Sequence, residues 1–133
     1  MKRAFVILLV LFTALAVGCT YKFSPGELEH IEFYESTNIT DWDNNVLEKK
    51  HIITISSENT GLAERITEIV NNNSLQQGVY KRNESCITEY RDPGLVILKY
   101  KVGIITIEQD FCENNSQFNI IYNNIESAIE TFK

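Results

Sequence analysis

Residues 95–108 are the most strand-like stretch of the chain and read LVILKYKVGIITIE. β-Branched and other apolar residues dominate this stretch, and such residues favour extended strands. Gly103 is a weak turn signal, so the stretch predicts either two strands, Leu95–Val102 and Ile104–Glu108, or one long bent strand with a bulge. Asp92-Pro93-Gly94 precedes it and is a strong turn signal, because proline presets φ and glycine takes the left-handed position. The sheet is therefore expected to be built around residues 95–108.

Three segments upstream of this stretch also predict strands. His30–Glu35 alternates apolar with charged side chains, as a half-buried strand does. His51–Ser56 contains a β-branched run that is typical of a strand covered on at least one face. Val79–Tyr90 is a third candidate with a weak middle at residues 83–85. Residues 36–50 are rich in Asn and Asp, and they predict a long loop between the first two strands.

Two further segments predict helices with one apolar face. The first begins at a cap on Asn59 or Thr60 and ends at Asn71-Asn72-Asn73, and the second closes the chain. Apolar residues recur at helical spacing in both: Leu62, Ile66, Ile69 and Val70 in the first, and Phe118, Ile121, Tyr122, Ile125, Ile129 and Phe132 in the second. Each helix must bury its apolar face, and strands and helices do not alternate regularly. The expected fold is therefore α+β, an antiparallel sheet of four to five strands with two amphipathic helices packed on one face.

The N-terminus has the features of an export signal. Lys2 and Arg3 are followed by residues 4–17, an apolar stretch of fourteen residues interrupted only by Thr13. A membrane-spanning helix needs about 20 apolar residues, so this stretch is too short to span a bilayer and fits the hydrophobic region of a secretory signal.

The end of this signal, Leu15-Ala16-Val17-Gly18-Cys19, resembles the lipobox of prokaryotic lipoproteins. The resemblance implies cleavage after Gly18, a diacylglyceryl group on the Cys19 thiol and a further acyl chain such as palmitate on the freed amine. It divides the chain into a signal peptide at 1–18, a lipidated tether at 19–27 and one domain at 28–133. The domain would face the periplasm or the exterior from the cell membrane or the outer membrane. The alternative is an ordinary secretory signal that leaves Cys19 as an odd thiol or a disulfide partner.

Composition limits the possible partners. The chain of 133 residues has a formal charge of −6 and is 44% hydrophobic. Only two of the 12 basic residues precede Cys19, which leaves 10 basic against 18 acidic residues and a charge of −8 after residue 19. Nucleic acid is not an expected partner, because phosphate binding requires clustered Lys and Arg. A lipid membrane through Cys19 and a protein of the cell envelope are the expected partners.

Cys86 and Cys112 are the two remaining cysteines. An exported compartment favours a disulfide between them, which would stabilise the fold by roughly 3 kcal/mol. A geometric difficulty opposes the bond, because in a simple meander the two residues lie on the first and third strands, which are not neighbours. Two free buried thiols are the alternative.

The loop at 41–45, Asp-Trp-Asp-Asn-Asn, opens like a calcium-binding loop, but Val46 stands where that motif needs glycine and Ile52 where it needs glutamate. A solvated loop is therefore expected. Trp42 is the only tryptophan in the chain. If exposed, it would be a candidate binding anchor, since tryptophan is enriched at interface hot spots. If folded back, it would seal an edge of the core.

No catalytic, cofactor or metal-binding residues are predicted. His30 and His51 are the only histidines, and the residues around them do not form a zinc-binding pattern. The chain has no Gly-x-Ser-x-Gly elbow, no His-Glu-x-x-His and no glycine-rich phosphate loop. We therefore expect a membrane-anchored binding module rather than an enzyme. The alternative is an inhibitor or immunity protein against an envelope-acting enzyme or toxin.

Overall fold

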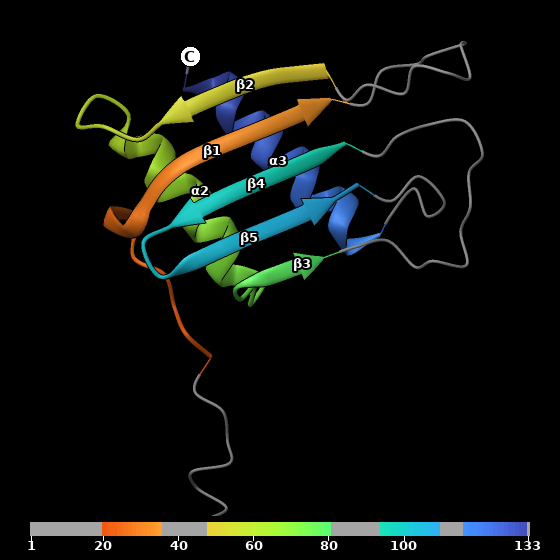
Figure 1. Ribbon diagram of the computed structural model, residues 1–133, viewed down its shortest axis with the longest axis horizontal. Coiled ribbons are helices and arrows are strands. Elements are labelled where there is room, and N and C mark those ends of the chain that lie inside the picture. The colour runs from red at the N-terminus through yellow and green to blue at the C-terminus, as the bar shows by residue number, and fades with distance from the viewer. Residues whose placement is uncertain (1–19, 36–47, 81–93, 110–115, 133) are drawn as a thin grey trace, which may run out of the picture.

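The computed structural model describes residues 20–35, 48–80, 94–109 and 116–132. Within these ranges the chain forms eight elements, labelled as in Figure 1. In chain order they are η1 (Pro25–Glu27), β1 (Leu28–Glu35), β2 (Glu48–Thr54), α2 (Thr60–Asn72), β3 (Gly78–Tyr80), β4 (Leu95–Tyr100), β5 (Gly103–Glu108) and α3 (Gln117–Thr131).

The five strands form one sheet in the order β2-β1-β4-β5-β3, and both helices lie on the same face of it (Figure 1). This confirms the predicted α+β fold. The sheet is mixed rather than fully antiparallel, because β3 pairs parallel with β5 while the other neighbouring pairs are antiparallel. The reason lies in α2, which begins after β2 at one edge and delivers the chain to β3 at the opposite edge.

Residues 95–108 form two strands rather than one bent strand. β4 and β5 are joined by Lys101 and Val102, and Tyr100 pairs with Gly103 across the turn. Gly103 has a φ of 156°, which L side chains rarely adopt, and a β-carbon there would lie 2.8 Å from the side-chain Cδ of Gln77. Gly103 is therefore the residue that divides this stretch into a hairpin.

Some strand boundaries differ from the predictions. β2 begins at Glu48, inside the segment predicted as a loop, because it pairs with the end of β1 beyond a bulge at Phe33 and Tyr34. Of the predicted strand Val79–Tyr90, the structure describes only the part within β3, and residues 81–93 lie outside the described ranges.

The core lies between the helices and the covered face of the sheet. The apolar stripes predicted for the two helices supply one side of it and alternate residues of β1, β4 and β5 supply the other. Phe132 is the exception, because it lies just beyond the end of α3 and is 48% exposed. The largest fully buried apolar side chains are Phe33, Ile31, Ile66, Leu98, Ile105, Ile107, Ile121, Ile125, Ile129, Val70 and Val96. A buried hydrogen bond of 3.0 Å between the hydroxyls of Thr67 and Tyr100 ties α2 to β4.

The N-terminal segment predicted as a tether packs against the domain. Phe23 is only 5% exposed, and its ring centroid lies 4.4 Å from that of Tyr100. The Asn71 side chain holds the same residue in place by accepting from the Phe23 N–H at 2.9 Å and donating to the Phe23 carbonyl at 2.8 Å. The fold therefore begins before residue 28, and Phe23 belongs to its core.

Gly94 is required by the packing of Tyr122 rather than by a left-handed backbone. The described residues with positive φ are Ser74, Gly78 and Gly103, so the expectation of a left-handed Gly94 is wrong. A β-carbon on Gly94 would lie 2.6 Å from Cζ of Tyr122, whose hydroxyl donates to the carbonyl of Tyr34 at 2.9 Å. The glycine thus makes room for a ring that links α3 to β1.

Gly94→Ala is expected to lower the free energy of unfolding by about 1–3 kcal/mol, because the added methyl must displace the Tyr122 ring. Urea denaturation measures the change. Gly26→Ala is the matched control, since a β-carbon at Gly26 meets nothing within 4 Å. Equal stability of the two variants would show that Tyr122 does not occupy this position.

Candidate functional site

The face of the sheet opposite the helices is not covered by any described element (Figure 1). We call it the open face. Side chains alternate across a sheet, so residues next to the buried Ile31 and Phe33 point to this side. The open face comprises Ile52 and Thr54 of β2, His30, Glu32 and Tyr34 of β1, Leu95, Ile97 and Lys99 of β4, Ile104, Thr106 and Glu108 of β5, and Val79 of β3.

One row of the open face crosses all five strands. Strand pairing places Ile52 beside Glu32 and Glu32 beside Ile97. It then places Ile97 beside Thr106 and Thr106 beside Val79. The row thus has an aliphatic side chain at each edge and a carboxylate on the strand next to one edge.

Glu32 is the centre of a polar cluster on this face. Its carboxylate accepts hydrogen bonds from the Tyr34 hydroxyl at 2.9 Å and from Lys99 Nζ at 3.1 Å. His30 Nε2 lies 3.3 Å from the same carboxylate. These groups come from two neighbouring strands and stand on one side of the sheet because they occupy alternate positions.

The hydrogen bonds to Glu32 fix its charge state. The bond from Tyr34, followed by that from Lys99, holds the pKa of the Glu32 carboxyl below its ordinary value, against an opposing effect of burial. The bond with Glu32 also raises the pKa of Tyr34. Because the folded pKa of Glu32 lies below the unfolded one, the cluster stabilises the fold above the ordinary carboxyl pKa. That contribution is lost as the pH falls through the lowered pKa. Glu32 is therefore a fixed negative charge at neutral pH.

Thr54 extends the cluster to the edge strand. Its hydroxyl oxygen lies 3.4 Å from His30 Nδ1, so a hydroxyl, an imidazole and a carboxylate follow one another across the face. Such a sequence activates a hydroxyl nucleophile when the imidazole acts as general base and the carboxylate orients it. Here, however, Thr54 is solvent-exposed and Glu32 is already bound by Tyr34 and Lys99. The Glu32 carboxylate is therefore shared among Tyr34, Lys99 and His30.

Exposed aliphatic side chains flank the polar cluster at Ile52 and Ile104, and Val79 adds a third at the far edge of the sheet. Ile52 is 44%, Ile104 48% and Val79 58% exposed. They lie on three different strands, so the exposed apolar area extends across the sheet. Aliphatic side chains around a hydrogen-bonded ion pair form a surface of mixed polarity, as in protein interfaces.

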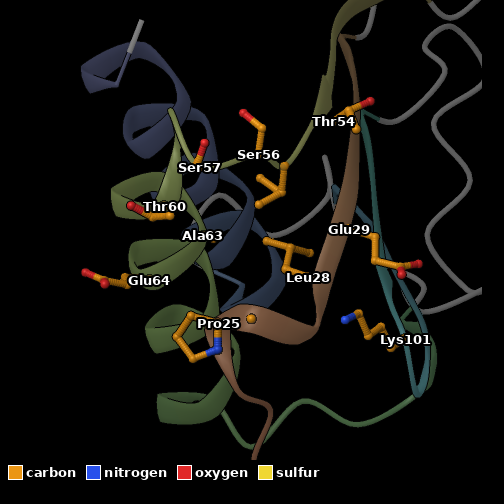
Figure 2. A pocket seen from close by; sticks show the side chains of 12 residues that line it. Pro25, Leu28, Glu29, Thr54, Ser56, Ser57, Thr60, Ala63, Glu64 and Lys101 are labelled. Atoms are coloured by element: carbon orange, nitrogen blue, oxygen red, sulfur yellow. The ribbon is translucent and has the colours of Figure 1, made fainter.

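A concave feature lies at the end of the domain where β1 begins (Figure 2). It is a cavity of about 570 Å³ between η1, the start of β1, the end of β2 and the first turns of α2. Leu28 and Ala63 give it apolar walls, and Thr54, Ser56, Ser57 and Thr60 add hydroxyls. Figure 2 shows the ammonium group of Lys101 directed toward the cavity and the carboxylates of Glu29 and Glu64 directed away from it.

Sequence reasoning missed the cluster around Glu32. It found no zinc-binding pattern around His30, and it did not pair His30 or Glu32 with Lys99. The alternation of His30, Glu32 and Tyr34 was the available signal, because it places them on one face. Lys99 is 67 residues from Glu32, so only the pairing of β1 with β4 brings it there.

His51 lies on the covered side of the sheet, so the two histidines do not form one site. Its Nε2 is 3.4 Å from a Glu130 carboxylate oxygen, close enough for an ionic contact but not aligned as a hydrogen bond. The neighbouring Lys50 donates to Glu126 at 2.9 Å. The ion pair of Lys50 and Glu126 links the edge strand β2 to α3.

The other residues predicted for a site lie outside the described ranges. They are Cys19, Trp42, Cys86 and Cys112. Among the described residues, no group of three or more His, Cys, Asp or Glu side chains is placed to hold a metal ion. In the same part of the chain, no helix is long and apolar enough to cross a membrane.

Comparisons with known proteins do not assign the chain to a family. No protein-family model matches it, and no curated protein and no solved structure shows significant similarity to it.

Proposed function

We propose that this protein is a lipid-anchored module of the prokaryotic cell envelope that binds another protein through the open face of its sheet. The anchor is the acylated Cys19 implied by the lipobox resemblance of residues 15–19. The observation that carries the binding role is the open face itself, where the exposed aliphatic side chains of Ile52 and Ile104 flank the Glu32 cluster.

The chemistry of the open face favours binding over catalysis. Ile52, Ile104 and Val79 would lose water on contact with a partner, and each contributes apolar area to the interface. The ion pair of Glu32 and Lys99 would be desolvated at the same time. Because that pair is already hydrogen-bonded, it would enter the interface without an unpaired charge. The open face therefore combines an apolar contact area with polar groups that fix the orientation of the partner.

The net charge of the chain indicates which class of protein it would bind. The chain carries a net charge of −8 after residue 19. Opposite charge speeds encounter and discriminates against wrong partners, so we propose a basic envelope protein that presents an aliphatic surface.

A second candidate is an inhibitor or immunity protein against an envelope-acting enzyme or toxin. The same acidity supports it, since such a target would be a basic protein. The two candidates differ in what the partner does. One tight, stoichiometric complex that abolishes the partner's enzymatic activity favours the inhibitor, whereas a complex with no effect on an activity favours the binding module.

The test compares two double substitutions in the protein with the anchoring cysteine replaced, Cys19→Ser. Ile52→Glu with Ile104→Glu alters the open face, and Ile120→Glu with Phe132→Glu alters exposed apolar positions of the α3 segment. Partners from envelope extracts are captured, identified and titrated against each variant. We expect the open-face variant to bind the partner at least about thirtyfold more weakly, because hot-spot residues are typically worth 2 kcal/mol or more.

The α3 variant is expected to bind as the unsubstituted protein does. Loss of binding in the α3 variant alone would contradict the proposal, and thermal unfolding of each variant checks that the fold is retained. A hydrolytic turnover that disappears in His30→Ala would replace binding with catalysis as the function.

A further inference from the structure

We infer that the N-terminal end of the domain is a second membrane contact, in which Tyr21, Lys22, Lys101 and Val102 rest on the phosphate groups of the phospholipid headgroups and fix the orientation of the domain. The inference rests on the proposed acylation of Cys19. It adds a lipid-binding surface made by the folded domain itself.

The first step is that the chain between the acylation site and the folded domain is short. Phe23 is buried, and Gln76 Nε2 donates to the carbonyl of Tyr21 at 2.8 Å. Thr20 is the only residue between Cys19 and Tyr21. Because one residue spans at most about 3.6 Å, an acylated Cys19 would hold Tyr21 within roughly 7 Å of the lipidated residue. The domain would therefore sit at the headgroups instead of moving freely above them.

The second step is that the turn between β4 and β5 lies beside this segment. The rings of Phe23 and Tyr100 are in contact, and the Lys101 N–H donates to the Glu27 carbonyl at 2.8 Å. Figure 1 shows the turn and the N-terminal segment at the same end of the molecule. Whatever holds Tyr21 at a membrane thus brings Lys101 and Val102 close to it.

The third step is the chemistry of this end. Tyr21 is 46% and Val102 48% exposed, and Lys22 and Lys101 are exposed cations. Aromatic side chains favour the headgroup region, and lysines near the surface are attracted to lipid phosphates. Two carboxylates, Glu27 and Glu29, lie at the same end, and that of Glu27 accepts hydrogen bonds from the Tyr21 hydroxyl at 2.7 Å and the Ser24 N–H at 2.8 Å. The lysines are therefore balanced in charge, and the exposed Tyr21 and Val102 side chains supply the apolar part of the contact where the anchor begins.

The fourth step is the orientation that follows. β1, β3 and β5 run in the same direction, and they end at Glu35, Tyr80 and Glu108, at the opposite end from the β4–β5 turn. With the turn on the membrane, these strand ends point away from the bilayer. The eight-residue strand β1 would span about 26 Å of that height. The open face would then stand beside the membrane, where it remains accessible to an envelope protein.

The experiment uses the full, acylated chain in vesicles of phosphatidylethanolamine and phosphatidylglycerol with brominated acyl chains. A single tryptophan is placed at the turn by Val102→Trp in a Trp42→Phe background. The matched control is Ile120→Trp in the same background, because Ile120 is an exposed residue in the first turns of α3, near the end of β5. Bromine quenching reports how close each tryptophan lies to the acyl region.

We expect the tryptophan at 102 to be quenched at least about twofold more than the one at 120, with a blue-shifted emission. Lys22→Glu with Lys101→Glu should lower the quenching at 102 to the level of the control while the protein still floats with the vesicles. Arg65→Glu, a change of an exposed cation on α2, should leave it unchanged.

The experiment distinguishes failure of the second membrane contact from failure of the proposed anchor at Cys19. Equal quenching at 102 and 120 in protein that carries the acyl mass and floats with vesicles overturns this inference and leaves the proposed function standing. Protein that lacks the acyl mass and does not float overturns the proposed anchor, and the inference with it.

Discussion

Replacing Phe23 by alanine is expected to lower the free energy of unfolding by about 3–5 kcal/mol, as is typical for buried aromatic residues. The side chain is 5% exposed and contacts the rings of Tyr21 and Tyr100. Truncation leaves a cavity between the N-terminal segment and the sheet, and it removes the contact that keeps the segment in place. Because small domains have only about 5–15 kcal/mol of stability, this change would be a large part of the total. Urea denaturation of the unacylated Cys19→Ser protein measures it.

Tyr21→Ala is the matched control, since Tyr21 precedes Phe23 by two residues and is 46% exposed, against 5% for Phe23. It is expected to change stability by less than about 1 kcal/mol. Phe23→Ala should also make the bonds on either side of residue 23 cleavable by added protease, whereas Tyr21→Ala should not. Equal stability of the two variants would show that residues 21–24 are not part of the fold, and the short distance between anchor and domain would no longer follow.

Loss of the predicted disulfide is expected to have the second largest effect. Cys86 and Cys112 lie outside the described residues, but the strands that precede them are described. Cys86 follows Tyr80 of β3 by six residues, and Cys112 follows Ile107 of β5 by five. Tyr80 and Ile107 are paired in parallel, so the chain leaves both strands at the same end of the sheet. The objection drawn from a simple meander therefore does not apply to this topology.

Cys86→Ser and Cys112→Ser are each expected to lower the free energy of unfolding by roughly 3 kcal/mol, from the chain entropy released in the unfolded state. The double substitution should cost no more than either single one, because both remove the same bond. Thiol titration of the unfolded, unreduced Cys19→Ser protein provides a direct measurement. Two reactive thiols would rule out the bond, and unequal or additive effects of the two serines would argue that the cysteines act separately.

Local patterns were enough to predict most of the elements. The spacing of Leu62, Ile66 and Ile69 predicted α2 and its buried face, and the structure confirms both. Gly103 was recognised as a possible division, and its φ of 156° confirms that the chain turns there. The parallel pairing of β3 was not predictable from residues 78–80, because it depends on where α2 crosses the sheet.

The features that matter most for function depend on contacts between distant residues. Residues 19–27 were predicted as a tether, yet Phe23 is buried because its backbone is hydrogen-bonded by Asn71 and its ring packs on Tyr100. The open face likewise exists only once strand order is known, since its row draws single residues from five strands. A sequence pattern shows which side of a strand a residue occupies, but it does not show which residues of other strands lie beside it.

The central claim is that Cys19 carries the membrane anchor, and metabolic labelling with a fatty acid tests it most directly. Wild type and Cys19→Ser are labelled in the cell, and the N-terminal peptide of each is identified by mass spectrometry. We predict label in the wild type on a peptide that begins at Cys19, and none in Cys19→Ser. Label that persists in Cys19→Ser, or an unlabelled wild type cleaved at another residue, would contradict it.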